Sequence, residues 1–218
     1  MIYLFLKYFL YLCNMKKKTP AILVPEGADK VLLHACCAPC SSAIVEWMLA
    51  NGVRPTIFYF NPNIYPLAEY ELRKEESKRH AENLGLSWID GDYQHEAWLH
   101  EVCGLEMEPE RGRRCELCFR YRLTVAAQEA KKQGLTFFTT TLASSRWKSI
   151  EQITRAGEAA QNAVPGTVFW AQNWRKGGLS DRRNQLLKEY GFYNQQYCGC
   201  EFSMRKSSVV PIGDEEEQ

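Results

Sequence analysis

The chain has 218 residues, with 27 lysines and arginines against 26 aspartates and glutamates, and a formal net charge of +1. This length fits one domain with a sizeable core, and the hydrophobic fraction of 45% is ordinary for a globular protein. The near-neutral charge neither requires nor excludes a nucleic-acid partner. Nine cysteines are many for this length, but the alternation of strand and helix patterns argues against a small secreted disulfide scaffold.

The N-terminal segment differs in composition from the rest of the chain. Residues 1–13 are almost entirely apolar or aromatic, and three lysines follow at 16–18. This run is too short for a membrane-spanning helix and lacks the features of a signal peptide. It is either a short membrane-binding segment or an extension that lies outside the fold. We interpret 1–20 as a flexible or spurious extension with Met15 as the natural start, and we expect one α/β domain over 21–210 and an acidic tail over 211–218.

Predicted elements alternate along the chain. The apolar run 31–33 predicts a buried strand, and the apolar-periodic segment 43–49 predicts a helix capped by Ser41 or Ser42. Apolar, β-branched and aromatic residues predict further strands at 55–60, 86–90, 135–141 and 167–170. Helices are predicted at 67–84, 93–103, 115–133, 149–161 and 181–190. This order indicates an α/β fold with an open, mostly parallel sheet and helices on both faces, as in Rossmann-like proteins.

Two cysteine groups lie where predicted helices begin. Cys36, Cys37 and Cys40 follow the first strand, at a position where open α/β sheets bind ligands. Cys115 and Cys118 open the long helix, three residues apart and therefore on one face. Helix N-termini stabilise thiolates. The spacing fits an iron–sulfur cluster, a zinc site or redox disulfides.

A third pair of cysteines, Cys198 and Cys200, flanks a single glycine. A disulfide between thiols so close would be strained and labile, and two further metal ligands are the alternative. His34 precedes the first cysteine group and is either a packed core histidine or a functional one. Cys13 and Cys103 have no partner nearby in sequence, and we interpret both as structural or incidental.

Basic residues gather near the cysteines, with tryptophans among them. These basic and aromatic residues either form an ordinary solvated surface or contact the phosphates and bases of a nucleic acid. The candidates for RNA contact are Arg114, Arg146, Lys148, Arg175 and Lys176.

Seven short motifs occur in a fixed order between Val31 and Ser203. They are HACCAPC at 34–40, FNPNI at 60–64, EYELR at 69–73, RCELCFR at 114–120, FTTTL at 138–142, RKG at 175–177 and YCGCEFS at 197–203. Together they resemble the cobalamin-independent epoxyqueuosine reductase family of the QueH type. That family completes queuosine at the wobble position of certain tRNAs by reducing an epoxide to an alkene, with water as the by-product.

The resemblance implies a role for each cysteine group. Cys36, Cys37, Cys115 and Cys118 would bind a [4Fe-4S] cluster, and Cys198 with Cys200 would form a redox-active disulfide. Cys40 is a further candidate metal ligand, which allows a second metal ion near the cluster. The implied fold is similar to that of ATP-dependent PP-loop enzymes but without their glycine-rich phosphate loop, and this sequence has none at 36–42.

The resemblance also implies partners, and two other functional classes remain as alternatives. We expect a cytoplasmic oxidoreductase without a membrane partner, which acts on tRNA carrying epoxyqueuosine and takes electrons from a donor that the sequence does not specify. Two other classes are weighed against it. A PP-loop-type tRNA thiolase would bind ATP, and a non-catalytic zinc module that interacts with RNA would contain zinc alone.

Overall fold

The computed structural model describes residues 22–204, so the predicted extension at 1–20 and tail at 211–218 lie outside the described residues. Five strands form one sheet in the order β3-β2-β1-β4-β5, and every neighbouring pair is parallel. The strands are β1 (Lys30–His34), β2 (Arg54–Tyr59), β3 (Trp88–Asp90), β4 (Phe137–Thr140) and β5 (Val168–Phe169). The predicted open parallel sheet is confirmed.

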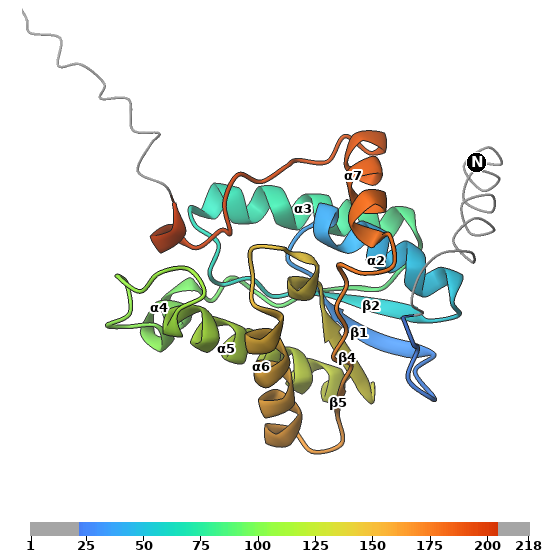
Figure 1. The fold of residues 1–218 in the computed structure, drawn as a ribbon, viewed down its shortest axis with the longest axis horizontal. Coiled ribbons are helices and arrows are strands. Elements are labelled where there is room, and N and C mark those ends of the chain that lie inside the picture. The colour runs from blue at the N-terminus through green and yellow to red at the C-terminus, as the bar shows by residue number, and fades with distance from the viewer. Residues whose placement is uncertain (1–21, 205–218) are drawn as a thin grey trace, which may run out of the picture.

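Helices cover both faces of this sheet (Figure 1). On one face α2 (Ala38–Ala50) packs against α3 (Leu67–Asn83) and α7 (Leu179–Glu189). On the other face α5 (Arg113–Lys132) packs against α4 (His95–Glu101) and α6 (Ile150–Ala163). Because both faces are covered, the middle of the central strand is apolar, and Val31, Leu32 and Leu33 are fully buried.

The start of α2 differs from the prediction. The helix begins at Ala38 rather than at residue 43, with Cys37 as its N-cap and Pro39 in the first turn, where a missing N–H has no cost. The predicted capping by Ser41 or Ser42 is wrong. Their hydroxyls lie inside the helix and donate back to the carbonyls of Cys37 at 3.1 Å and Pro39 at 3.3 Å.

The register of the two central strands brings distant segments together. His34 at the end of β1 pairs with Thr140 at the end of β4. The residues that follow β1 and the short 3₁₀ helix η1 (Thr141–Ser144) therefore lie side by side at the carboxyl edge of the sheet. This is the edge at which parallel α/β sheets bind ligands.

His80, on α3, is buried without a hydrogen-bond partner for either ring nitrogen. Its ring lies edge-on to Tyr190 and Phe192, at centroid distances of 5.3 and 5.1 Å. Burial in these aromatic surroundings lowers the pKa of His80 to about 4. The folded protein therefore holds this histidine neutral.

We expect this histidine to make stability fall in mild acid. Since the folded-state pKa lies below the unfolded value of about 6.5, the stabilisation is complete above pH 6.5 and is lost as pH falls toward 4. The loss amounts to about 3 kcal/mol at most. Urea unfolding of wild type and His80→Phe between pH 7.5 and 4.5 checks this, and two parallel curves would contradict it.

Candidate active site

Three cysteines meet where β1 passes into α2. The Sγ atoms of Cys36, Cys37 and Cys40 all lie within 4.8 Å of one another, and those of Cys36 and Cys37 are 3.8 Å apart. Cys36 belongs to the turn, Cys37 caps the helix and Cys40 lies in its first turn. Three thiols at this spacing can bind one metal ion or one edge of a cluster. We call these residues the sulfur triad.

Hydrogen bonds from distant segments orient the sulfur triad. The Thr141 hydroxyl donates to Cys36 Sγ at 3.3 Å and accepts from the Cys36 amide at 3.1 Å. The Gln195 amide donates to Cys37 Sγ at 3.1 Å. Such bonds fix the orientation of the two sulfurs and favour the thiolate form.

The three thiols of the triad share negative charge unequally. Hydrogen bonds from Cys37, and then from Cys40, lower the pKa of Cys36 well below its usual value. Burial raises the pKa of Cys37, and the hydrogen bond to Cys36 raises that of Cys40 to about 12. Of the three thiols, that of Cys36 is therefore the most acidic.

The half-buried Lys148 and the buried Arg122 lie near the sulfurs. Burial lowers the pKa of the Lys148 amine, but charge interactions with the Cys198 and Cys36 sulfurs more than offset this, so its pKa is raised. The buried Arg122 guanidinium bonds to the neutral side-chain oxygen of Asn61 and to the Cys118 sulfur, and its Nε has no partner. A buried cation whose partners are neutral is stabilised by a nearby anion, because burial removes its solvation by water. A thiolate-bound metal centre supplies one, so these residues fit such a group.

Cys115 and Cys118 lie in the first turns of α5, whose N-cap is Gly112. The Arg111 amide donates to Cys115 Sγ at 3.3 Å, and Cys118 packs against the buried Trp98. Burial raises the pKa of both thiols, to about 11 for Cys115. In these residues the helix N-terminus therefore does not by itself produce thiolates, and a bound metal would have to do so.

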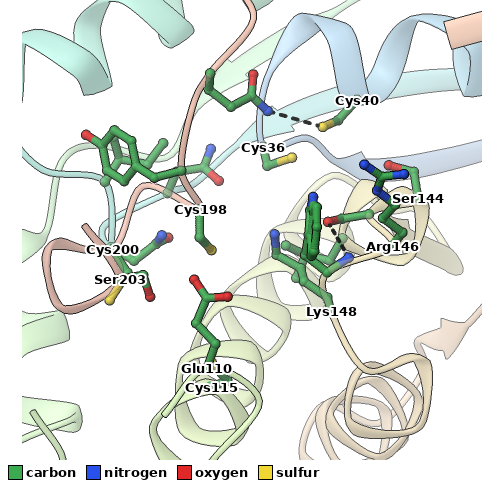
Figure 2. Close-up of a pocket in the computed structure, with 18 of the residues that line it drawn as sticks. Cys36, Cys40, Glu110, Cys115, Ser144, Arg146, Lys148, Cys198, Cys200 and Ser203 are labelled. Carbon is green, nitrogen blue, oxygen red and sulfur yellow. Dashed lines mark hydrogen bonds between the residues drawn. The ribbon is translucent and has the colours of Figure 1, made fainter. Parts of the chain in front are cut away.

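Six of the predicted cysteines line one cavity of about 1300 Å³ (Figure 2), whereas the buried Cys37 is not part of that lining. Its lining includes Cys36 and Cys40 from the triad, Cys115 and Cys118 from α5, and Cys198 and Cys200 from the C-terminal segment. In the view of Figure 2, Cys198 lies between Cys36 and Cys115. The N-termini of α2 and α5 therefore contribute thiols to one cavity, whereas the predicted set of cluster ligands stays a prediction.

The Cys198–Cys200 turn depends on its central glycine. Gly199 has φ +105°, and its carbonyl accepts from the Tyr65 amide at 2.9 Å. Cys198 is partly exposed, while Cys200 is buried beside Trp98, which raises its pKa to about 12. Both thiols are free in the structure, so the predicted disulfide between them stays a prediction.

Replacing this glycine is expected to distort the site. In Gly199→Ala the new Cβ would lie 2.8 Å from Ile64 Cγ1, which is too close for two carbon atoms. The positive φ would add a backbone cost of about 1–2 kcal/mol. Gly191→Ala is the matched control, since φ is +62° there but the space is open. Thermal unfolding should show a larger fall in Tm for Gly199→Ala. Equal falls would mean that the packing at 199 has no role.

Two of the predicted RNA contacts hold loops in place. Arg114 is buried, and its Nη1 donates to three carbonyls of the loop 105–108, the closest at 2.5 Å. Arg175 donates to the carbonyls of Ser145 and Lys148. Nη1 of Arg114 and Nη2 of Arg175 are therefore occupied by loop carbonyls, and a phosphate contact through the remaining N–H groups of either residue stays a prediction.

The other predicted contacts differ in their position. Arg146 is exposed and lines the cavity together with Lys148. Lys176 is exposed and is not part of the cavity lining.

His34 is a packed core histidine. Its Nε2 donates to the Phe60 carbonyl at 3.0 Å, and its Nδ1 accepts from the Thr140 hydroxyl at 2.8 Å. Burial, followed by the Arg122 charge, lowers its pKa to about 3. Cys103 is exposed outside the cavity lining, and Cys13 lies outside the described residues.

Sequence reasoning missed several side chains of the site. Thr141 and Gln195 bond to the triad sulfurs, and Arg122 lies beside Cys118. Arg73, also buried, pairs with Glu69 at 2.6 Å and donates to the Cys198 carbonyl at 3.5 Å. Thr141 and Arg73 fall inside quoted motifs, but nothing in the sequence assigned them a role, and Gln195 falls outside them.

The fold and the site define a parallel α/β protein with a cavity lined by cysteine thiols and cations at the carboxyl edge of its sheet. The family model described as "Epoxyqueuosine reductase QueH" matches residues 31–206. The chain belongs to the QueH family of epoxyqueuosine reductases, a family of tRNA-modifying oxidoreductases.

Curated relatives agree with this assignment. The epoxyqueuosine reductase QueH of Haemophilus influenzae is 46% identical over 185 residues, which are 85% of this chain and 76% of the relative. That of Thermotoga maritima is 38% identical over 178 residues, which are 80% of this chain and 90% of the relative.

A solved structure shows the same fold. The U34-tRNA thiolase NcsA from Methanococcus maripaludis, with its [4Fe-4S] cluster, matches with a TM-score of 0.55 over 91% of this chain and 69% of its own. At 12% sequence identity, the likeness concerns the fold alone. It confirms the predicted PP-loop-like architecture.

Within residues 22–204, no helix combines the length and the apolar character needed to cross a membrane.

Proposed function

We propose that this protein reduces the epoxide of epoxyqueuosine in tRNA to the alkene of queuosine. The single observation that carries the proposal is the placement of three cysteine groups around one cavity in a chain of the QueH family. The cavity, of about 1300 Å³, has room for a nucleoside. Because tRNA is the substrate, we place the reaction in the cytoplasm.

A [4Fe-4S] cluster held by Cys36, Cys37, Cys115 and Cys118 is part of this proposal. The donor types, the hydrogen bonds to the triad sulfurs and the buried Arg122 support it. Cys40, within 4.8 Å of two of these sulfurs, is available for a second metal ion. When bound, such a centre supplies single electrons and a Lewis acid.

The cysteine pair of the C-terminal segment supplies the two-electron chemistry. Removing the epoxide oxygen as water takes two electrons and two protons. Two thiols that join in a disulfide release both, so one Cys198–Cys200 dithiol balances one epoxide, with alkene, water and disulfide as products. An external electron donor then returns the pair to its reduced form.

Other side chains prepare the cavity for this step. The pKa of Lys148 is raised by the nearby sulfurs, and its ammonium in turn lowers the pKa of the Cys36 thiol. Arg73 bonds to the Cys198 carbonyl and thereby positions the backbone of the pair. Arg146 extends the positive charge of the cavity lining toward an RNA substrate.

The test is reduction by the anaerobically purified protein. Wild type is incubated with tRNA that carries epoxyqueuosine and a chemical reductant, and the nucleosides are analysed by mass spectrometry after digestion. We expect queuosine to form, with iron and acid-labile sulfide in the protein. Zinc alone without product would favour the RNA-binding module, and ATP-dependent sulfur transfer would favour the thiolase.

A further inference from the structure

The loop that follows η1 is held in one conformation by two arginines from elsewhere in the chain. Arg175 donates to the carbonyls at both ends of 145–148, Ser145 and Lys148. Arg111 donates to the two in the middle, with Nη2 3.1 Å from the Arg146 carbonyl and Nε 2.9 Å from that of Trp147. All four consecutive carbonyls are therefore bound, which fixes this loop before any ligand arrives.

This fixed loop presents an exposed tryptophan. Trp147 is 61% exposed and lines the cavity that contains the cysteines. The Cζ atom of Arg146 lies 4.8 Å from its ring centroid, so a guanidinium stacks on the indole. By contrast, four other tryptophans of the described chain are at most 7% exposed: Trp47, Trp98, Trp170 and Trp174. The exposed indole is thus presented at the cavity by a loop whose four carbonyls are all hydrogen-bonded.

We propose that Trp147 is a stacking platform for a nucleobase next to the base that is reduced. The inference rests on the proposed function, because a base at the wobble position belongs to a single-stranded loop whose neighbouring bases can be splayed out. An aromatic ring binds such a base through its π-face, whatever its sequence. The stacked Arg146 adds a cation to the same surface.

A second hollow beside the platform suits the phosphates of the same strand. It has a volume of about 520 Å³ and lies at the start of α6. Glu151 also lines it, but its carboxylate is paired with Arg155 at 2.6 Å. Four cationic residues line both this hollow and the main cavity: Arg111, Arg146, Lys148 and Arg175. Trp147 thus lies where an RNA strand would pass from the thiol-lined cavity to a basic surface. The positive charge of that surface favours RNA over an apolar partner.

The test separates RNA binding from chemistry. Affinity is measured for tRNA and for an unmodified single-stranded RNA heptamer with the anticodon-loop sequence, and kcat and KM are measured with tRNA carrying epoxyqueuosine. Trp147→Ala should weaken binding and raise KM by about 5- to 150-fold, the range that stacking on one aromatic ring gives. Trp147→Phe should recover most of this, and kcat at saturating tRNA should stay near wild type.

Met107→Ala is the matched control, since Met107 is 96% exposed and is not part of the cavity lining. Unchanged affinity and KM in Trp147→Ala, or an equal loss in the control, would overturn the platform and leave the proposed reductase activity intact. Conversely, a wild-type protein that produces no queuosine, yet loses RNA affinity in Trp147→Ala, would overturn the activity and support the platform.

Discussion

Cys198→Ser is expected to lower kcat for epoxide reduction by about 1,000-fold or more, as the loss of a catalytic nucleophile does in other enzymes. Serine has nearly the same shape but cannot give up electrons to form a disulfide. The Cys198 side chain is partly exposed in the cavity and is absent from the sulfur triad, so iron content and tRNA affinity should stay near wild type. Nucleoside mass spectrometry and metal analysis on the same preparation measure all three.

A single-turnover experiment sharpens this prediction. Wild type is fully reduced, freed of reductant and mixed with excess substrate. It should form up to one queuosine per chain while two thiols disappear, and Cys198→Ser should form little or none. Cys103→Ser is the control, because that thiol is exposed and outside the cavity lining. Full turnover in Cys198→Ser would remove the pair from the mechanism, and a loss of iron would make Cys198 a metal ligand instead.

Cys200 needs a different substitution. Its side chain is buried beside Trp98 and Cys118, so a serine hydroxyl there would lose its hydrogen bonds to water. Cys200→Ala removes the thiol without burying a polar group, although it leaves a small cavity. A paired loss of turnover in Cys198→Ser and Cys200→Ala, with iron retained in both, is the result that the dithiol chemistry requires.

The parts of the fold that local pattern determines could be predicted from the sequence. Val31, Leu32 and Leu33 form an apolar run because β1 is covered on both faces, and the strand–helix alternation required parallel strands. The start of α2 was misplaced, because Ser41 and Ser42 resemble caps in sequence. Only the structure shows that their hydroxyls bond to carbonyls within the helix.

The parts of the site that depend on long-range contacts could not be predicted. Gln195 donates a hydrogen bond to Cys37, which is 158 positions away in the sequence, and no local pattern predicts such a bond. The charge pattern predicts that Arg114 and Arg175 belong to a basic surface, but in the structure their guanidinium groups donate to loop carbonyls. A sequence gives the charge of an arginine and not the acceptors around it. Family motifs therefore located the site better than the charge pattern did.

Cys115→Ser is expected to remove most of the iron and acid-labile sulfide, of which a [4Fe-4S] cluster holds about four each. The reason is that Cys115 stands on the α5 side of the cavity, and a cluster held from two helix N-termini loses its anchor on one of them. Cys36→Ser should have the same effect from the α2 side. Absorbance near 400 nm, iron and sulfide assays on anaerobic protein provide the measurement.

Cys40→Ser distinguishes the proposed ligand set from a set centred on the triad. If Cys40 binds only a second metal ion, this variant should keep its sulfide and lose at most about one iron. The geometry alone favours no such difference, since the three triad sulfurs lie within 4.8 Å of one another. Full loss of sulfide in Cys40→Ser, together with a cluster that survives in Cys115→Ser, would move the centre onto the triad and leave the α5 thiols free to face the substrate.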